Sequence, residues 1–162
     1  MGTLVAFWIL AVVAVVAALG VVFIKNVFRA ALSLVACFLM VAGLYVTLSA
    51  DFLAAVQVLV YVGAISVLII LAIMMTRDVQ RGNPSNKLRF PAFLVAILFF
   101  VVLVYAVVRT SWPLATAPPL EPTTATLALQ LFGEGGYILP VEIAAVLLLS
   151  AIIGAIVLAR EK

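Results

Sequence analysis

Three polar side chains and one glycine stand out because they could handle water or protons inside apolar stretches of this sequence. Gln57, Tyr61 and Gly63 lie in the run QVLVYVGAISV, where most neighbours are aliphatic. Glu142 lies in a second apolar run near the C-terminus. An amide and a phenol both donate and accept hydrogen bonds, and a carboxyl group can also carry a proton. These four positions are therefore the candidates for a proton path or its gate.

The usual centres of enzyme catalysis are missing from the sequence. It contains no histidine and one cysteine, Cys37. This excludes His-based zinc sites, Ser-His triads, an intrachain disulfide and a cluster held by cysteines of this chain. It also has no Gly-rich phosphate loop. We therefore expect no catalytic, metal-binding or cofactor-binding residue here, and we expect another protein to hold any electron carrier.

The spacing within QVLVYVGAISV leaves two interpretations open. On an α-helix, Gln57 and Tyr61 share a face that Ala64 and Leu68 continue, while Ser66 lies opposite. In one interpretation these groups bond to a neighbouring helix, and the glycine allows close packing. In the other, the polar face borders a file of water, and the glycine lets the helix twist or carry a π-bulge.

Glu142 is the one charged residue placed clearly within a predicted membrane span. No Lys, Arg or His lies within any of those spans, so the carboxyl group has no cationic partner there in this chain. A carboxylate in hydrocarbon is costly. Either it stays neutral, or a neighbouring chain pairs with it, or it reaches the headgroups because it follows Tyr137 by only five residues.

The elements that must position these residues are membrane helices. The chain has 162 residues, of which 69% are hydrophobic and 9% charged. A soluble domain of this length could not bury so much apolar surface. Uncharged runs of about 20 residues span a bilayer as helices, because lipid offers the backbone no hydrogen bonds. We predict an all-α integral membrane protein, a single transmembrane domain over residues 1–162, with five helices at about 3–24, 30–50, 52–76, 91–108 and 137–159.

The basic residues predict the orientation of these helices. Alternating loops place eight basic residues on one side and only Arg109 on the other, and the basic side faces the cytoplasm. The N-terminus is then outside and the C-terminus cytoplasmic, with a long periplasmic loop at 109–136. Within that loop, residues 123–132 form a short amphipathic piece at the interface, and Ser49 or Asp51 caps the third helix. The eight basic residues are Lys25, Arg29, Arg77, Arg81, Lys87, Arg89, Arg160 and Lys162.

Long segments of the sequence resemble one family of respiratory membrane subunits. DFLAAVQVLVYVGAISVLIILAIMM, residues 51–75, closely resembles the third helix of the J subunit of bacterial proton-translocating NADH-quinone oxidoreductase, the counterpart of mitochondrial complex I membrane chain 6. LFGEGGYILPVEIAAVLLLS, residues 131–150, is similar to its fifth helix and lead-in. Asn26 with the AAL of residues 30–32 resembles the start of its second helix. The resemblance covers nearly the whole chain.

The resemblance implies a place and a mechanism. Members of the family have five transmembrane helices and pack among other membrane-arm subunits, near the peripheral redox arm where quinone is reduced. Their third helix carries a π-bulge around the positions of Tyr61 and Gly63. Its straightening makes or breaks a water wire that couples quinone reduction to proton translocation. FMN, iron–sulfur clusters and quinone are then expected elsewhere in the complex. The expected location is the bacterial cytoplasmic (inner) membrane, with membrane lipid and no nucleic acid among the partners.

One position departs from that family pattern, and other functions stay open. Some relatives carry a glutamate where this chain has Gln57, and an amide can bind water but cannot carry a net proton charge at neutral pH. A proton-relay role for Gln57 is therefore in doubt, whereas Tyr61 suits a gate or a water anchor. The alternative functions are a small membrane subunit of a multi-subunit cation/proton antiporter and a passive helical spacer.

Overall fold

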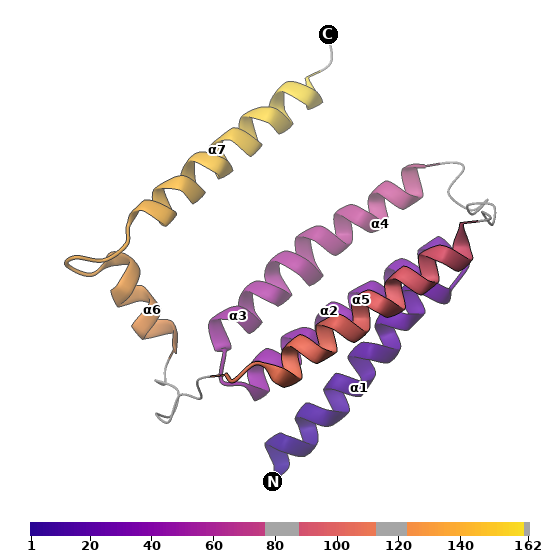
Figure 1. Cartoon of the computed structure of the whole chain (residues 1–162). Coiled ribbons are helices and arrows are strands. Elements are labelled where there is room, and N and C mark those ends of the chain that lie inside the picture. The colour runs from indigo at the N-terminus through magenta and orange to yellow at the C-terminus, as the bar shows by residue number, and fades with distance from the viewer. Residues whose placement is uncertain (77–87, 113–122, 161–162) are drawn as a thin grey trace.

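The structure, a computed structural model, describes residues 1–76, 88–112 and 123–160 (Figure 1). The regular elements within those ranges are all helices, and five of them are long and apolar enough to cross a membrane. The prediction of an all-α protein with five membrane helices is therefore confirmed. Their inside–outside orientation stays a prediction from the charge count. The basic loop between the third and fourth helices falls at 77–87, outside the described residues.

The helix bounds differ from the predicted ones by a few residues. The third span is one continuous rod, Asp51–Met75, made of α3, the π-helix η1 and α4. The last span begins two residues later than predicted, at Leu139, with Pro140 in its first turn, where its missing N–H costs little. The elements are α1 (Gly2–Phe23), α2 (Val27–Thr47), α3 (Asp51–Val56), η1 (Gln57–Ile65), α4 (Ser66–Met75), α5 (Arg89–Arg109), α6 (Thr123–Phe132) and α7 (Leu139–Ala159).

The second and third spans, which follow short connections, begin with different kinds of N-cap residue. Asn26 caps α2 because its side-chain oxygen accepts a hydrogen bond from the Arg29 N–H at 3.2 Å. The prediction that Ser49 or Asp51 caps the third helix is wrong. Ala50 is the N-cap residue and no side chain bonds there, because Ser49 takes a φ of 56° to turn the chain and Asp51 already lies in the first helical turn. In that turn the Asp51 carboxylate favours the positive end of the helix dipole.

Small residues let α1 and α2 approach closely. The buried residues of this pair are Ala14 on α1 and Ala31 and Ala42 on α2. Ser33 Oγ donates a hydrogen bond across the pair to the Ala17 carbonyl at 2.8 Å, and Cys37 Sγ lies 3.6 Å from the Ala14 carbonyl. Membrane helices associate through such small-residue packing and interhelical hydrogen bonds, so Ser33 and Cys37 act as packing groups.

Gly20 and Gly43 show how closely these two backbones approach. A Cβ added at Gly20 would collide with Ser33 Oγ, and one at Gly43 would lie 3.1 Å from Leu10 Cδ1. Helix α2 also packs against α3, η1 and α4, so it lies between α1 and the third rod. The three rods run side by side in Figure 1 and form the only extensive packing among the described residues. The candidate residues Gln57, Tyr61 and Gly63 lie on the third of these rods.

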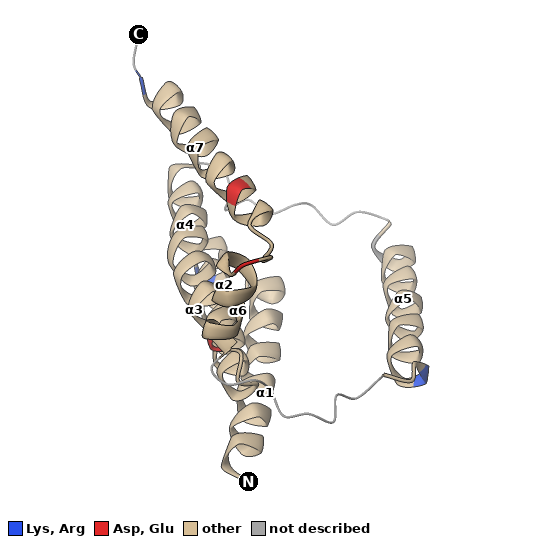
Figure 2. Ribbon diagram, turned by 90° about the vertical axis from the view of Figure 1, so that its left-hand side faces the viewer, with Lys and Arg blue, Asp and Glu red and all other residues tan. Residues whose placement is uncertain are grey.

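The helices α5 and α7 stand outside this three-rod unit. Figure 2 shows α5 well separated from the other helices, and no described side chain of α5 or α7 is buried. The chain exposes 13895 Å². A compact soluble monomer of its mass would expose about 7,800 Å². Most of this excess apolar surface therefore needs lipid or other membrane proteins to cover it.

Candidate functional site

The third span changes its helical register near the middle of its length. Residues Gln57–Ile65 form the π-helix η1, with α-helix on both sides. Tyr61 and Gly63 both lie inside η1, so the π-bulge implied by the family resemblance is present at the expected place. π-Helical turns are rare and are found often at functional sites. This segment is therefore the centre of the candidate site.

Gln57 anchors the start of η1 to α2. Its side chain is 7% exposed, and its Nε2 donates a hydrogen bond to the Phe38 carbonyl at 3.4 Å. A buried amide without a partner would destabilise the fold, and this bond across helices offsets that cost. Gln57 thus has the packing role that one interpretation of the sequence gave it.

Tyr61 meets the same residue of α2 with its ring. The Tyr61 and Phe38 rings lie edge to face, with centroids 5.5 Å apart and planes at 70°. Gln57 and Tyr61 therefore both face α2, as their four-residue spacing predicts. Tyr61 is nevertheless 42% exposed, and its hydroxyl has no hydrogen-bond partner within the described part of the chain. The ring is packed while the hydroxyl is available to water or to a neighbouring protein.

Ser66 lies on the buried face of the rod, although a regular α-helix would place it opposite Gln57. Each α-helical residue advances about 100°, so the nine positions from Gln57 to Ser66 amount to two and a half turns. Each π-helical residue advances about 80°, so the same nine positions complete about two turns. Ser66 is 2% exposed and Gln57 is 7% exposed. The prediction that Ser66 lies opposite was wrong because it assumed α-helical spacing throughout.

The π-helix also decides which face of α4 meets α2. The half-buried residues of α4 are Ile69, Ile70 and Ile73, whereas Leu68 is exposed. A continuous α-helix would turn these isoleucines away from the face of Gln57 and Ala54 by about half a turn. A continuous α-helix would rotate Tyr61 by much less than these isoleucines, because only four positions separate Tyr61 from Gln57.

Gly63 and Ala64 are exposed and do not pack inside this chain. A Cβ added at Gly63 would meet only the Val58 carbonyl oxygen, at 3.4 Å, which is close to an ordinary contact. The chain's own atoms therefore do not require a glycine at this position. The bare backbone patch faces away from α2, toward whatever covers this side of the rod.

Glu142 lies at the end of the first turn of α7, and its side chain is exposed. Because α7 begins at Leu139, Glu142 is closer to the helix start than a helix beginning at Tyr137 would place it. The positive end of the helix dipole favours a carboxylate there. The structure does not bring Glu142 together with Gln57 and Tyr61, since α7 makes no extensive contact with the third rod.

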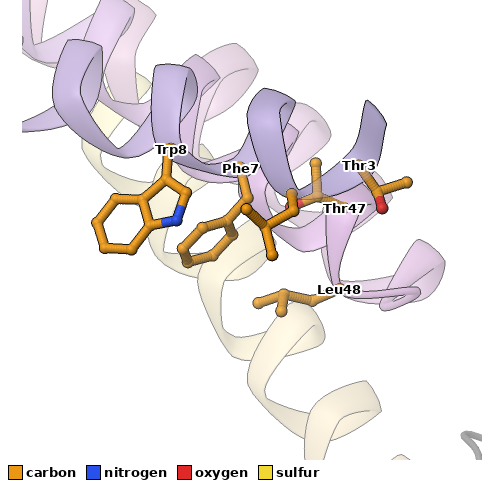
Figure 3. A pocket seen from close by; sticks show the side chains of 6 residues that line it. Thr3, Phe7, Trp8, Thr47 and Leu48 are labelled. Carbon is orange, nitrogen blue, oxygen red and sulfur yellow. The ribbon is translucent and has the colours of Figure 1, made fainter. Parts of the chain in front are cut away.

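A separate apolar pocket of about 330 Å³ lies between the start of α1 and the end of α2 (Figure 3). The side chains of Phe7 and Trp8 extend from α1, near those of Thr47 and Leu48. The Thr47 hydroxyl donates to the Leu44 carbonyl at 2.8 Å, so it is already satisfied. None of the four candidate residues lines this pocket.

A metal site is also absent from the described ranges, where no three His, Cys, Asp or Glu side chains gather. Across these ranges the polar chemistry therefore concentrates on η1 and its contact with Phe38. The arrangement can bind water, hold a helix register and turn a helix face.

Comparison with known proteins places the chain in a family. Residues 17–158 match the family model described as NADH-ubiquinone/plastoquinone oxidoreductase chain 6. The NAD(P)H-quinone oxidoreductase chain 6 of Leptolyngbya boryana is 43% identical over 162 residues, which cover 98% of this chain and 80% of that protein. The same protein of Synechocystis sp. is 44% identical over 161 residues, or 97% of this chain and 80% of that one.

An archaeal relative bears a name with a different electron donor. The F(420)H(2) dehydrogenase subunit J of Methanosarcina mazei is 40% identical over 160 residues, which cover 96% of this chain and 90% of that protein. The match thus covers nearly all of this chain and 80–90% of each of these three relatives. With its five membrane helices and its π-helical third span, the chain belongs to the family of NADH-quinone oxidoreductase chain 6, a membrane subunit of a multi-subunit enzyme complex.

Proposed function

We propose that this chain is a membrane-arm subunit of a proton-pumping NADH-quinone oxidoreductase and that its third span gates proton movement. The single observation that carries the gate is η1, a π-helix in the middle of a membrane span with Tyr61 inside it. A π-helix has an α-helical alternative of the same sequence, so the rod has two available registers. An element with two states is what a coupling mechanism needs.

The geometry indicates what a change of register would do. Gln57 holds the start of η1 to α2 through the Phe38 carbonyl, so this part of the rod stays fixed. Conversion of η1 to α-helix then turns everything beyond it by about half a turn, because each of nine residues advances about 20° further. Tyr61, four positions beyond Gln57, turns by about 80° and moves its hydroxyl relative to α2. This rotation connects or interrupts a water file that the hydroxyl anchors by donating and accepting hydrogen bonds.

Electron transfer belongs to other subunits in this proposal. With one cysteine and no histidine, the chain cannot supply the ligands of an iron–sulfur cluster. FMN and the site of quinone reduction belong to neighbouring subunits in this proposal. Relatives named for NAD(P)H and for F420H2 match this chain at similar identity. The donor is then set by the peripheral arm, while this subunit serves the membrane side in a bacterial cytoplasmic membrane. Other membrane-arm subunits cover α5 and α7.

Purification of the intact complex tests this assignment. A tag on the C-terminus, mild-detergent extraction, mass spectrometry and an NADH-quinone reductase assay would be applied to the same eluate. We expect a large complex that contains flavin and iron–sulfur proteins and oxidises NADH. A complex that oxidises another reduced carrier would overturn NADH as donor only. Antiporter-like chains without redox proteins, or the chain alone, would overturn the assignment itself.

A further inference from the structure

Two buried polar side chains bracket the π-helix. Among the described residues, Gln57 and Ser66 are the only buried polar or charged residues. Gln57 is the first residue of η1 and Ser66 is the first residue after it. Buried polar groups need hydrogen-bond partners, and both of these find one in a backbone carbonyl. Gln57 binds α2, whereas Ser66 binds its own helix.

The bonds of Ser66 are specific to the π register. Its Oγ donates to the Tyr61 carbonyl at 2.7 Å, and its backbone N–H is shared between the carbonyls of Tyr61 and Gly63. In an α-helix the Ser66 N–H would bind the Val62 carbonyl instead. A serine hydroxyl on an α-helix reaches back three or four residues, not five. The hydroxyl bond to Tyr61 must therefore break when the rod straightens.

We propose that Ser66 is a positioning residue that holds the third span in its π-helical register. Its hydroxyl is a second donor to the Tyr61 carbonyl, and this bond exists in one register and not in the other. Straightening would also carry Ser66 about half a turn from the face of Gln57, out of its buried place. Ser66 thus sets the balance between the two states of the rod, and it acts through Tyr61. The inference rests on the proposed function only for its consequence in proton pumping.

The test compares three variants in the assembled complex. Ser66→Ala removes the hydroxyl and leaves the rest of the side chain, so we expect it to fold. Ser66→Thr restores a hydroxyl on the same carbon. Ser33→Ala is the matched control, because it removes a serine hydroxyl bond of similar length, to the Ala17 carbonyl, without touching the third span. Electron cryomicroscopy with particle classification gives the ratio of π-helical to α-helical third spans in each.

One hydrogen bond to a carbonyl shifts a two-state balance by about five-fold. We expect the ratio of π-helical to α-helical classes to fall by about that factor in Ser66→Ala, to recover in Ser66→Thr, and to stay unchanged in Ser33→Ala. An unchanged ratio in Ser66→Ala would overturn the proposal. An equal fall in Ser33→Ala would do so as well, since it would show a general loss of stability.

A measurement of protons pumped per electron separates this inference from the proposed function. A changed register ratio with unchanged pumping would support the role of Ser66 and refute the gate. An unchanged register ratio, together with defective pumping in variants of Tyr61, would support the gate and overturn the role of Ser66. If Ser66→Ala does not assemble, Ser66→Cys offers a weak donor in the same place, and we expect an intermediate ratio.

Discussion

The Tyr61 hydroxyl can be separated from its ring by Tyr61→Phe. The edge-to-face contact with Phe38, at 5.5 Å between centroids, involves only the ring, so phenylalanine preserves it. Such a pair stabilises a fold by about 0.5–1.5 kcal/mol beyond its buried area. The hydroxyl has no partner in the described chain, so its removal costs no internal hydrogen bond. We expect assembly and thermal stability of the complex to stay within about 0.5 kcal/mol of wild type.

The effect of Tyr61→Phe on proton movement should be larger than its effect on stability. If the hydroxyl anchors a water file, its loss removes one hydrogen bond of about 1 kcal/mol and slows proton passage about five-fold. In the proposed function other subunits carry the electrons, so we expect NADH oxidation to continue while the number of protons pumped per electron falls.

In proteoliposomes, a pH-sensitive dye would measure proton pumping while the absorbance of NADH measures its oxidation in the same sample. Tyr61→Leu, which loses the ring contact as well, is the control for packing: we expect it to lower thermal stability in addition. A Tyr61→Phe complex that assembles normally and pumps the full number of protons per electron would refute the water-anchor reasoning.

Three further substitutions test the other candidate residues. Gly63→Ala should assemble and pump normally, because the added Cβ meets only the Val58 carbonyl at 3.4 Å. Gly63→Leu should impair pumping, or assembly as seen on native gels, because its side chain fills the exposed side of η1. Full pumping by both variants would remove Gly63 from the gate. Gln57→Leu breaks the bond to the Phe38 carbonyl and should lower the stability of the complex by about 1 kcal/mol, as measured by thermal dissociation of its membrane subunits, and an unchanged dissociation temperature would contradict the anchor. Glu142→Gln keeps the shape and removes the titratable group, so protons pumped per electron should fall while assembly stays normal. Normal pumping would leave Glu142 as a first-turn helix residue.

The spans were predictable because their signal is coarse. About twenty uncharged residues in a row must form a helix in lipid, and small shifts in where a helix begins do not change that inference. The start of the last span moved from Tyr137 to Leu139, and this changed the interpretation of Glu142. The cap of the third helix was missed because the left-handed turn at Ser49 depends on how two helices meet.

The π-helix was predictable only through resemblance. No residue type encodes a bond to the fifth residue back in preference to the fourth, because the two differ by a small energy that packing decides. The consequence for Ser66 was therefore missed, although a serine just after an apolar run with a glycine is visible in the sequence. A periodicity computed with π spacing across Gln57–Ile65 would have placed Ser66 on the buried face.

The interface between subunits is the part that one chain cannot determine. Apart from charged residues such as Glu142 and Arg109 near their ends, α5 and α7 are almost entirely apolar on every side. Neither the sequence nor the packing of a single chain therefore distinguishes a lipid neighbour from a protein neighbour. Ser150 and Gly154 are four residues apart, a small-residue spacing that favours helix contact, yet a Cβ at Gly154 would meet nothing within 4 Å in this chain. We therefore expect a helix that packs on this face to come from a partner subunit.

The central claim is that the third span changes register while protons move. The most direct test is electron cryomicroscopy of the assembled complex at rest and during steady NADH-quinone turnover. The account predicts two classes, one with the Ser66 N–H on the Tyr61 carbonyl and one with it on the Val62 carbonyl, with α4 turned by about half a turn between them. A single π-helical third span in every class of a complex that is pumping protons would contradict it.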